Sequence, residues 1–263
     1  MEVFLDKRKA LNNFIIVGTQ RTGSSAVVSA LGTHPEICCG YEWTQRISAP
    51  KKIKVMAQAL QGNFSSLNPP DRKFLQSAFS EDIRWIGFKR LFRSSDKWVL
   101  HPKYSPALWI DRFNTHLYWF ANRPSIRIIH LVRCDNLAWL CSKLMSRKTK
   151  LFYGKEYPED IQVQADIKEA VKRLKAKKWL DSQLASLGES NPYLQILYED
   201  FARDHRAVIE RIVAFLACDP GVLPESIIKL KKQSVKPVEQ SIVNYDELAA
   251  VLREQKLMWQ LYS

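Results

Sequence analysis

The stretch Phe14-Ile15-Ile16-Val17-Gly18-Thr19-Gln20-Arg21-Thr22-Gly23-Ser24-Ser25 decides most of what the sequence says about this chain. Its four apolar residues predict a short buried strand. A loop bounded by Gly18 and Gly23 follows, and two hydroxyl residues then open a helix expected over Ser24–Gly32. A strand, a glycine-bounded loop and a helix N-terminus together form a cradle in which backbone N–H groups bind an anion.

The same stretch nearly fits the nucleoside-triphosphate loop G-x-x-x-x-G-K-[ST], with Gly18 and Gly23 at the required spacing. Ser24 stands where that loop has its lysine, and the cation lies upstream at Arg21. Because the lysine is the residue that reaches the β- and γ-phosphates, we expect an anion other than ATP or GTP. An ordinary strand–helix turn without a ligand is the structural alternative.

Length and composition predict one globular domain. The chain has 263 residues, of which 46% are hydrophobic, and we expect a single domain over 1–263 with its core at about 14–255. No run of about 18 apolar residues occurs, so no membrane span is expected. The charged segment 1–13 and five cysteines without zinc spacing favour free thiols and a cytoplasmic location.

The chain is strongly basic, with 40 Lys and Arg residues against 27 Asp and Glu residues and a net charge of +13. Such a charge fits a nucleic acid or a small anionic ligand. The basic run Lys172–Lys178 lies on a predicted helix with Val171 and Leu174 facing inward, so we expect it to be a solvated face. No nucleic-acid-binding motif is present, and no nucleic-acid partner is expected.

Hydrophobic patterning predicts alternating strands and helices. Strands are predicted at Phe14–Val17, Trp85–Phe88, Ile126–Val132 and Tyr193–Leu197, and helices at Ser24–Gly32, Lys51–Gln61, Ile110–Asn122, Asn136–Arg147, Ile161–Leu187, Asp200–Leu216, Pro224–Lys232 and Asp246–Gln255. This order predicts an α/β fold: a single P-loop-like domain with a parallel sheet flanked by helices. Ligands bind beyond the carboxyl ends of such strands, where Gly18–Ser25, Lys89, Arg133 and Tyr198–Asp200 are expected to gather.

A second informative segment runs from Ile128 to Asn136 and places Arg133 at the carboxyl end of a predicted strand. The planar guanidinium of arginine suits a phosphate group. Ser142 lies on the helix that follows. Pairing of Arg133 with Asp135 is the structural alternative.

Taken together, these segments resemble a PAPS-dependent sulfotransferase, in particular the bacterial carbohydrate-modifying type related to nodulation-factor and trehalose sulfotransferases. The resemblance rests on five segments in the expected order: Gln20–Ser25, Trp85–Lys89, Leu131–Ser142, Leu197–Phe201, and Lys231–Pro237 with Asn244–Leu248. One departure is the spacing from Arg133 to Ser142, which is nine residues where the family commonly has eight. A helix absorbs this difference with about 100° of rotation.

The resemblance implies a cofactor site for PAPS, with PAP as the product. Arg21, Thr22, Gly23, Ser24 and Ser25 would hold the 5′-phosphosulfate. Arg133, Ser142 and Lys232 would hold the 3′-phosphate, and Tyr198 would lie along the adenine. Lys89 would be a second cation beside the reacting group.

The resemblance also implies transfer of a sulfuryl group to a hydroxyl of a sugar or glycolipid, without a metal. A hydroxyl acceptor needs a general base; Glu42 matches the glutamate of the carbohydrate type, and His34 and Glu36 are alternatives. Two rival hypotheses remain. A P-loop kinase or NTPase would need Mg²⁺ and an acidic residue such as Glu199 or Asp200, and a non-catalytic polyanion binder would need neither.

Overall fold

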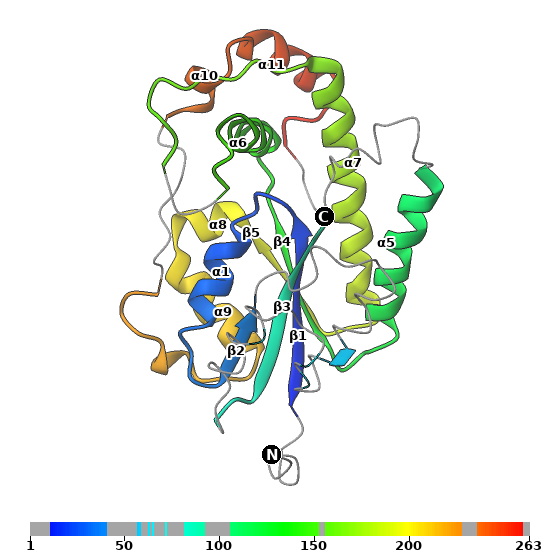
Figure 1. Cartoon of the computed structure of the whole chain (residues 1–263), viewed down its shortest axis with the longest axis vertical. Coiled ribbons are helices and arrows are strands. Elements are labelled where there is room, and N and C mark those ends of the chain that lie inside the picture. The colour runs from blue at the N-terminus through cyan, green and yellow to red at the C-terminus, as the bar shows by residue number, and fades with distance from the viewer. Residues whose placement is uncertain are drawn as a thin grey trace.

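Five parallel strands form the centre of the molecule (Figure 1). The computed structural model describes residues 11–40, 57–58, 63, 65, 72, 82–92, 106–152, 156–227 and 236–259. The strands are β1 (Asn12–Thr19), β2 (Ile37–Gly40), β3 (Trp85–Phe92), β4 (Arg127–Val132) and β5 (Tyr193–Leu197), in the sheet order β2-β3-β1-β4-β5. Every neighbouring pair is parallel. The predicted α/β fold with a helix-flanked parallel sheet is confirmed.

The central strand β1 packs on both faces, since successive side chains of a strand point to opposite sides. Phe14 and Ile16 join the core beneath α1 (Ser24–Leu31) and α9 (His205–Phe215). Ile15 and Val17 join the core beneath α5 (Pro106–Ala121) and α7 (Ile167–Ala185). A sheet covered on both faces has continuously apolar strands, which is why the pattern of this strand was easy to recognise.

A third core lies beyond the carboxyl ends of the strands. It joins α6 (Asn136–Thr149), α10 (Val238–Ser241) and α11 (Tyr245–Glu254) with part of α7, around Trp139, Leu174 and Leu248 (Figure 1). The chain end at Leu257–Trp259 packs on the turn before α6, where Asn136 donates hydrogen bonds to the carbonyl oxygens of Leu257 and Met258. This layer therefore fixes the position of the β4–α6 turn.

One strand was missed, and three predicted helices differ from the structure. The strand β2 was missed because its Ile-Cys-Cys-Gly sequence is short and lacks a strand pattern. The helix predicted over Asp200–Leu216 is two helices, α8 (Tyr198–Arg203) and α9, since Asp204 leaves the helical conformation and caps α9. Asp166 caps α7 in the same way, so that helix begins six residues later than predicted. Residues 224–227 are not helical.

The charged run on α7 is also corrected. Lys172, Lys175 and Lys178 are exposed as predicted, but Arg173 and Lys177 are buried, and Lys177 is 0% exposed. Lys177 lies one helical turn before Asp181, which is equally buried, and the two side chains form an ion pair of 3.0 Å. The burial of Lys177 was not predicted, because a lysine in a basic run was assumed to face solvent.

No helix in the described part of the chain is long and apolar enough to cross a membrane. All five cysteines carry free thiols, as the absence of zinc spacing had indicated. The short 3₁₀ turns Ser186–Glu189 and Pro220–Val222 complete the described secondary structure.

Candidate anion-binding site

The loop between β1 and α1 requires both of its glycines. Gly18 has a φ of +156°, and a Cβ atom there would lie 2.4 Å from the carbonyl oxygen of Leu131 on β4. Gly23 has a φ of +75° and packs against the ring of Tyr198, which a Cβ atom would approach to 3.1 Å. The loop is thus held between β4 and the start of α8, in a conformation that other residues adopt only with strain.

The N-terminus of α1 presents backbone donors at the end of this loop. The amides of Ala26 and Val27 donate to the carbonyl oxygen of Gly23. The amides of Ser24 and Ser25 have no acceptor in the part of the chain that the structure describes. These amides and the positive end of the helix dipole favour a bound anion.

Arg21 adopts a left-handed conformation with a φ of +70°, which turns its side chain towards α6 and the segment after it. Its guanidinium donates to Ser142 Oγ at 2.9 Å, to the carbonyl oxygen of Phe152 at 2.6 Å and to Tyr157 Oη at 3.1 Å. Burial lowers the pKa of Arg21; the nearby Tyr157 opposes this shift and the charge of Arg133 adds to it. The guanidinium therefore bridges the loop between β1 and α1 and the chain after α6.

The helix α6 fixes the loop from one side. Trp139 Nε1 donates to the carbonyl oxygen of Gln20 at 2.6 Å, and Lys143 Nζ donates to Gln20 Oε1 at 2.8 Å. Together with Ser142 these residues occupy positions i, i+3 and i+4, which share one helix face. One face of α6 therefore holds Gln20 and Arg21 in place.

Lys89 lies within β3, because this strand continues to Phe92 and does not end at Phe88 as predicted. Its side chain is 7% exposed and points to the α1 side of the sheet. Its Nζ atom donates to Ser25 Oγ at 2.8 Å. The structure thus places Lys89 beside the start of α1, where a second cation was predicted.

Arg133 follows β4 and faces the same loop. Its guanidinium lies over the ring of Tyr198 at 4.3 Å, and Nη1 donates to the carbonyl oxygen of Arg21 at 3.3 Å. Its Nε atom is buried and has no hydrogen-bond partner in the described chain. Asp135, the alternative partner, caps α6 by accepting from the amide of Ala138 at 2.8 Å.

Arg133 is anchored from beneath by a buried polar network. Lys177 Nζ donates to the carbonyl oxygen of Arg133 at 2.8 Å while it pairs with Asp181. His130, on the same face of the sheet, bonds through Nδ1 to Tyr193 Oη at 2.6 Å. Burying an ion pair is costly, so its value here lies in fixing the backbone that carries Arg133.

The two carboxylates that a magnesium-dependent enzyme would need are already engaged. Glu199 accepts hydrogen bonds from the amides of Cys134 and Asp135 at 3.2 and 3.0 Å. Asp200 pairs with Arg203 at 2.6 Å. Neither carboxylate is therefore available to a metal–phosphate complex without losing these contacts, which disfavours the kinase hypothesis.

The structure also separates the alternative general bases. His34 follows α1, and Glu36 directly precedes β2, so both lie at the amino ends of the parallel strands. The loop between β1 and α1 and Arg133 lie at the carboxyl ends. Glu42 and Lys232 lie outside the described residues.

Nine of the predicted residues thus come together at one edge of the sheet: Arg21, Thr22, Gly23, Ser24, Ser25, Lys89, Arg133, Ser142 and Tyr198. The Thr22 hydroxyl donates to the Thr19 carbonyl oxygen at 2.9 Å and so stabilises the loop itself. Sequence reasoning missed Trp139, Lys143 and Lys177. The spacing of Trp139, Ser142 and Lys143 could have revealed the first two, whereas Lys177 carried no signal beyond its i+4 partner Asp181.

A strand, a glycine loop and a helix N-terminus surrounded by three cations form a P-loop-like arrangement, the candidate anion-binding site. A model of the sulfotransferase family matches residues 13–219, and the chain belongs to this family. The predicted sulfotransferase family is confirmed, whereas PAPS dependence and the carbohydrate-modifying type stay predictions; the chain is a transferase of the sulfuryl-transferring class. A search of curated protein sequences gives no match.

Solved structures that are similar to this chain include three bacterial sulfotransferases. A sulfotransferase from Alicyclobacillus acidocaldarius aligns at 15% identity with a TM-score of 0.47, over 96% of this chain and 98% of that one. A sulfotransferase from Mycobacterium avium aligns at 12% identity with a TM-score of 0.45, over 94% and 76%. The sulfotransferase domain of the Synechococcus PCC 7002 olefin synthase aligns at 15% identity with a TM-score of 0.44, over 81% and 76%.

Proposed function

We propose that this protein transfers a sulfuryl group from PAPS to a hydroxyl of a sugar or glycolipid, and that 1–263 works as one such domain. The observation that carries the proposal is the meeting of the Arg21 loop, Lys89 and the buried Nε of Arg133, which has no partner among the described residues, at one edge of the sheet. A dianionic 3′-phosphate and a 5′-phosphosulfate are the kind of ligand that such a concentration of donors binds.

The residues present fit this cofactor. The amides of Ser24 and Ser25 supply donors for the 5′ end, and the Nε of Arg133 supplies a buried donor that needs an acceptor. A buried donor without an acceptor costs about 1–3 kcal/mol, so a phosphate oxygen beside Arg133 would remove that cost. PAPS, when bound, supplies an activated sulfuryl group whose leaving group is a phosphate.

Arg21, Lys89 and the start of α1 would stabilise the charge that grows on the departing phosphate oxygen. Pre-organised donors aimed at developing charge supply the largest single part of many rate enhancements. Arg21 is held in place by Ser142, Phe152 and Tyr157, so little reorganisation would be needed during the reaction. Thr22 and Gly23 would contribute through the loop backbone.

Arg133, Ser142 and Lys232 would hold the 3′-phosphate, and Tyr198 would lie along the adenine. The stacking of Arg133 on Tyr198 supports a shared site, since the same ring lines the loop at Gly23. Ser142 faces Arg21 despite the nine-residue spacing from Arg133. The extra residue is therefore compatible with a role for Ser142 in the cofactor site.

Glu42 would take the proton of the acceptor hydroxyl. The strand β2 ends at Gly40, which pairs with Phe88 next to Lys89, so this strand ends at the edge that carries the cations, two residues before Glu42 in the sequence. The other candidates, His34 and Glu36, precede β2 at the far edge. The sugar or glycolipid acceptor rests on the resemblance to the carbohydrate type, and a panel of sugar, glycolipid and phenol acceptors with PAPS would test it.

The cofactor assignment is tested by thermal shift with PAP, PAPS, ATP, GTP and a mixed oligonucleotide, each with and without Mg²⁺. A ligand that binds only the native state raises the melting temperature, so we expect PAP and PAPS to stabilise the protein independently of metal. Adenosine 5′-phosphosulfate, which lacks the 3′-phosphate, is the matched control and should stabilise less.

Two results would overturn the proposal. Stabilisation by ATP with Mg²⁺ but not by PAP would make the loop a divergent nucleoside-triphosphate site. Stabilisation by the oligonucleotide alone, falling steeply with salt, would make the protein a polyanion binder.

A further inference from the structure

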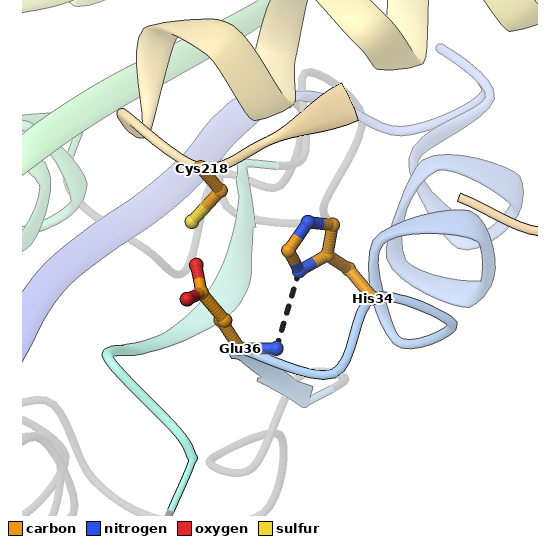
Figure 2. A group of neighbouring side chains, drawn as sticks. All are labelled: His34, Glu36 and Cys218. Carbon is orange, nitrogen blue, oxygen red and sulfur yellow. Dashed lines mark hydrogen bonds between the residues drawn. The ribbon is translucent and has the colours of Figure 1, made fainter. Parts of the chain in front are cut away.

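Three side chains of metal-binding type meet at the amino ends of the strands, away from the anion site (Figure 2). They are His34, Glu36 and Cys218, and one ligand atom of each lies within 4.8 Å of the others. His34 and Glu36 come from the turn between α1 and β2, and Cys218 comes from the chain after α9. The cluster therefore joins segments that are far apart in the sequence.

The hydrogen bonds of His34 settle which ring nitrogen faces the cluster. Nδ1 accepts from the backbone amide of Glu36 at 3.2 Å, so the proton of the neutral ring is on Nε2. Nε2 then donates to the carbonyl oxygen of Asp219 at 3.0 Å. A histidine that binds a metal through one nitrogen typically donates the other N–H to a carbonyl in this way. Coordination would replace the long bond from the Glu36 amide.

Two helices direct their negative ends towards this cluster. α1 ends at Leu31, three residues before His34, and α9 ends at Phe215, three residues before Cys218. The carbonyl groups at a helix C-terminus favour a cation. The left-handed conformation of Ala217, with a φ of +54°, turns the chain so that Cys218 points at Glu36 (Figure 2).

Two arginines in the described part of the chain lie beside the cluster. Arg84 pairs with the Glu36 carboxylate at 3.2 Å, with its side chain 45% exposed. Arg127 donates to the carbonyl oxygen of Phe215 at the end of α9. Burial, with the Glu36 carboxylate, raises the pKa of the Cys218 thiol to about 12. The thiol is therefore no nucleophile at neutral pH, and a metal-free catalytic triad is not formed here.

We propose that His34, Glu36 and Cys218 form a zinc-binding site that clips the α1–β2 turn to the end of α9. One nitrogen, one carboxylate oxygen and one sulfur ligand make the mixed set that Zn²⁺ accepts, with water as a fourth ligand. Zinc bonds of about 2.0–2.3 Å place tetrahedral ligand atoms about 3.3–3.8 Å apart. The three ligand atoms, which lie within 4.8 Å of one another, would therefore move about an ångström closer together on binding.

The binding step is an exchange of a proton for a metal ion. The Cys218 thiol donates to the carbonyl oxygen of Leu216 at 3.8 Å. Zn²⁺ takes the place of the thiol proton, an S–Zn bond forms, and one proton is released to solvent. No electron is transferred. The site stands apart from the reaction, because the anion site lies at the other edge of the sheet.

Titration of the purified, reduced protein with Co²⁺, followed by displacement with Zn²⁺, tests the site. One equivalent of Co²⁺ is expected to give a thiolate-to-metal charge-transfer band that Zn²⁺ removes. Cys218→Ser should abolish the band. Glu36→Gln, which keeps the side-chain shape, should weaken Zn²⁺ binding by more than the roughly 10- to 100-fold that loss of an outer partner causes.

Cys134→Ser is the matched control, because Cys134 is the least buried cysteine and the strongest competitor for adventitious metal. It should retain the band and the stoichiometry. A band that persists in Cys218→Ser, or that disappears in Cys134→Ser, would overturn the proposal. So would Zn²⁺ affinity unchanged by Glu36→Gln, a variant whose folding is checked independently by its circular dichroism.

Discussion

The two ends of α1 lie at opposite edges of the same sheet and carry opposite chemistry. At its N-terminus, unpaired amides meet Arg21, Lys89 and Arg133, which suits an anion. Beyond its C-terminus, His34 meets Glu36 and Cys218, which suits a cation.

The difference follows from the direction of the strands. Because all five run in parallel, a helix that packs along the sheet between two strands, such as α1, has its positive end at the carboxyl edge and its negative end at the amino edge. The helix dipoles therefore give the two edges of the sheet opposite partial charges, whatever the side chains are. The side chains at each edge bind ions of the sign that the local helix dipole also favours. Variants at the two edges test whether anion chemistry is confined to the carboxyl edge and cation binding to the amino edge.

Replacing the proposed base gives the largest expected effect. Glu42→Gln should lower turnover by about 10²–10⁴-fold, the range of general acid–base catalysis, with little change in PAP affinity. Steady-state kinetics with a saturating acceptor measure it, and Glu189→Gln on the exposed 3₁₀ turn is the control. If Glu36→Gln loses turnover while Glu42→Gln stays active, the general base is Glu36 at the amino edge. The two edges would then not have separate functions.

Removing the buried anchor of Arg133 should cost stability first. Lys177→Met leaves Asp181 buried without its cation, which costs about 3–5 kcal/mol in the free energy of unfolding. Urea unfolding measures this loss, and the double variant Lys177→Met with Asp181→Leu should recover most of it. If the double variant is stable but binds PAP as tightly as the parent, then Lys177 does not position Arg133.

Removing the cation of the phosphate loop should lower turnover by about 10²–10³-fold, the effect of losing one transition-state donor. The variant is Arg21→Ala, and the fold should survive because the guanidinium lies at the edge of the core. Single-turnover sulfuryl transfer is the measurement, with Arg203→Ala, whose side chain is 78% exposed, as the control. Unchanged turnover would remove Arg21 from the mechanism.

Arg133→Ala should weaken PAP binding by about 1.5–3 kcal/mol, the scale of a charge-assisted hydrogen bond, which is about 10- to 150-fold in Kd. Isothermal titration calorimetry with PAP measures it. Adenosine 5′-phosphosulfate should be affected much less, since it lacks the 3′-phosphate. Equal losses for both ligands would place Arg133 elsewhere in the site.

The smallest effect is expected at the other edge. Arg84→Ala removes the cation beside Glu36 and should tighten Zn²⁺ binding by about 2- to 5-fold, because exposed pairs contribute about 0.4–1 kcal/mol. A competition titration with a chromophoric chelator resolves this change. PAP affinity should stay the same, and a change in it would show that the two edges are coupled.

Local patterns predicted the strand–loop–helix unit, the order of alternating elements and the residues that follow the strands. They worked because a strand buried on both faces is continuously apolar, as Phe14–Val17 shows. They failed where the pattern was short, as in β2, or where a capping aspartate interrupts a helical stretch, as at Asp204. The neighbours of Arg21 could not be predicted, because its direction depends on a left-handed backbone.

The sequence by itself determined the anion cradle, the family and the set of cations expected beside the loop, because these depend on residues close together in the chain. Only the tertiary structure decided that Lys177 is buried beneath Arg133 and that side chains of α6 hydrogen-bond to Gln20. It also decided that His34 and Glu36 lie far from the loop. It alone brought Cys218 to Glu36 across more than 180 positions. Burial and partner choice come from the packing of distant segments, which no local spacing records.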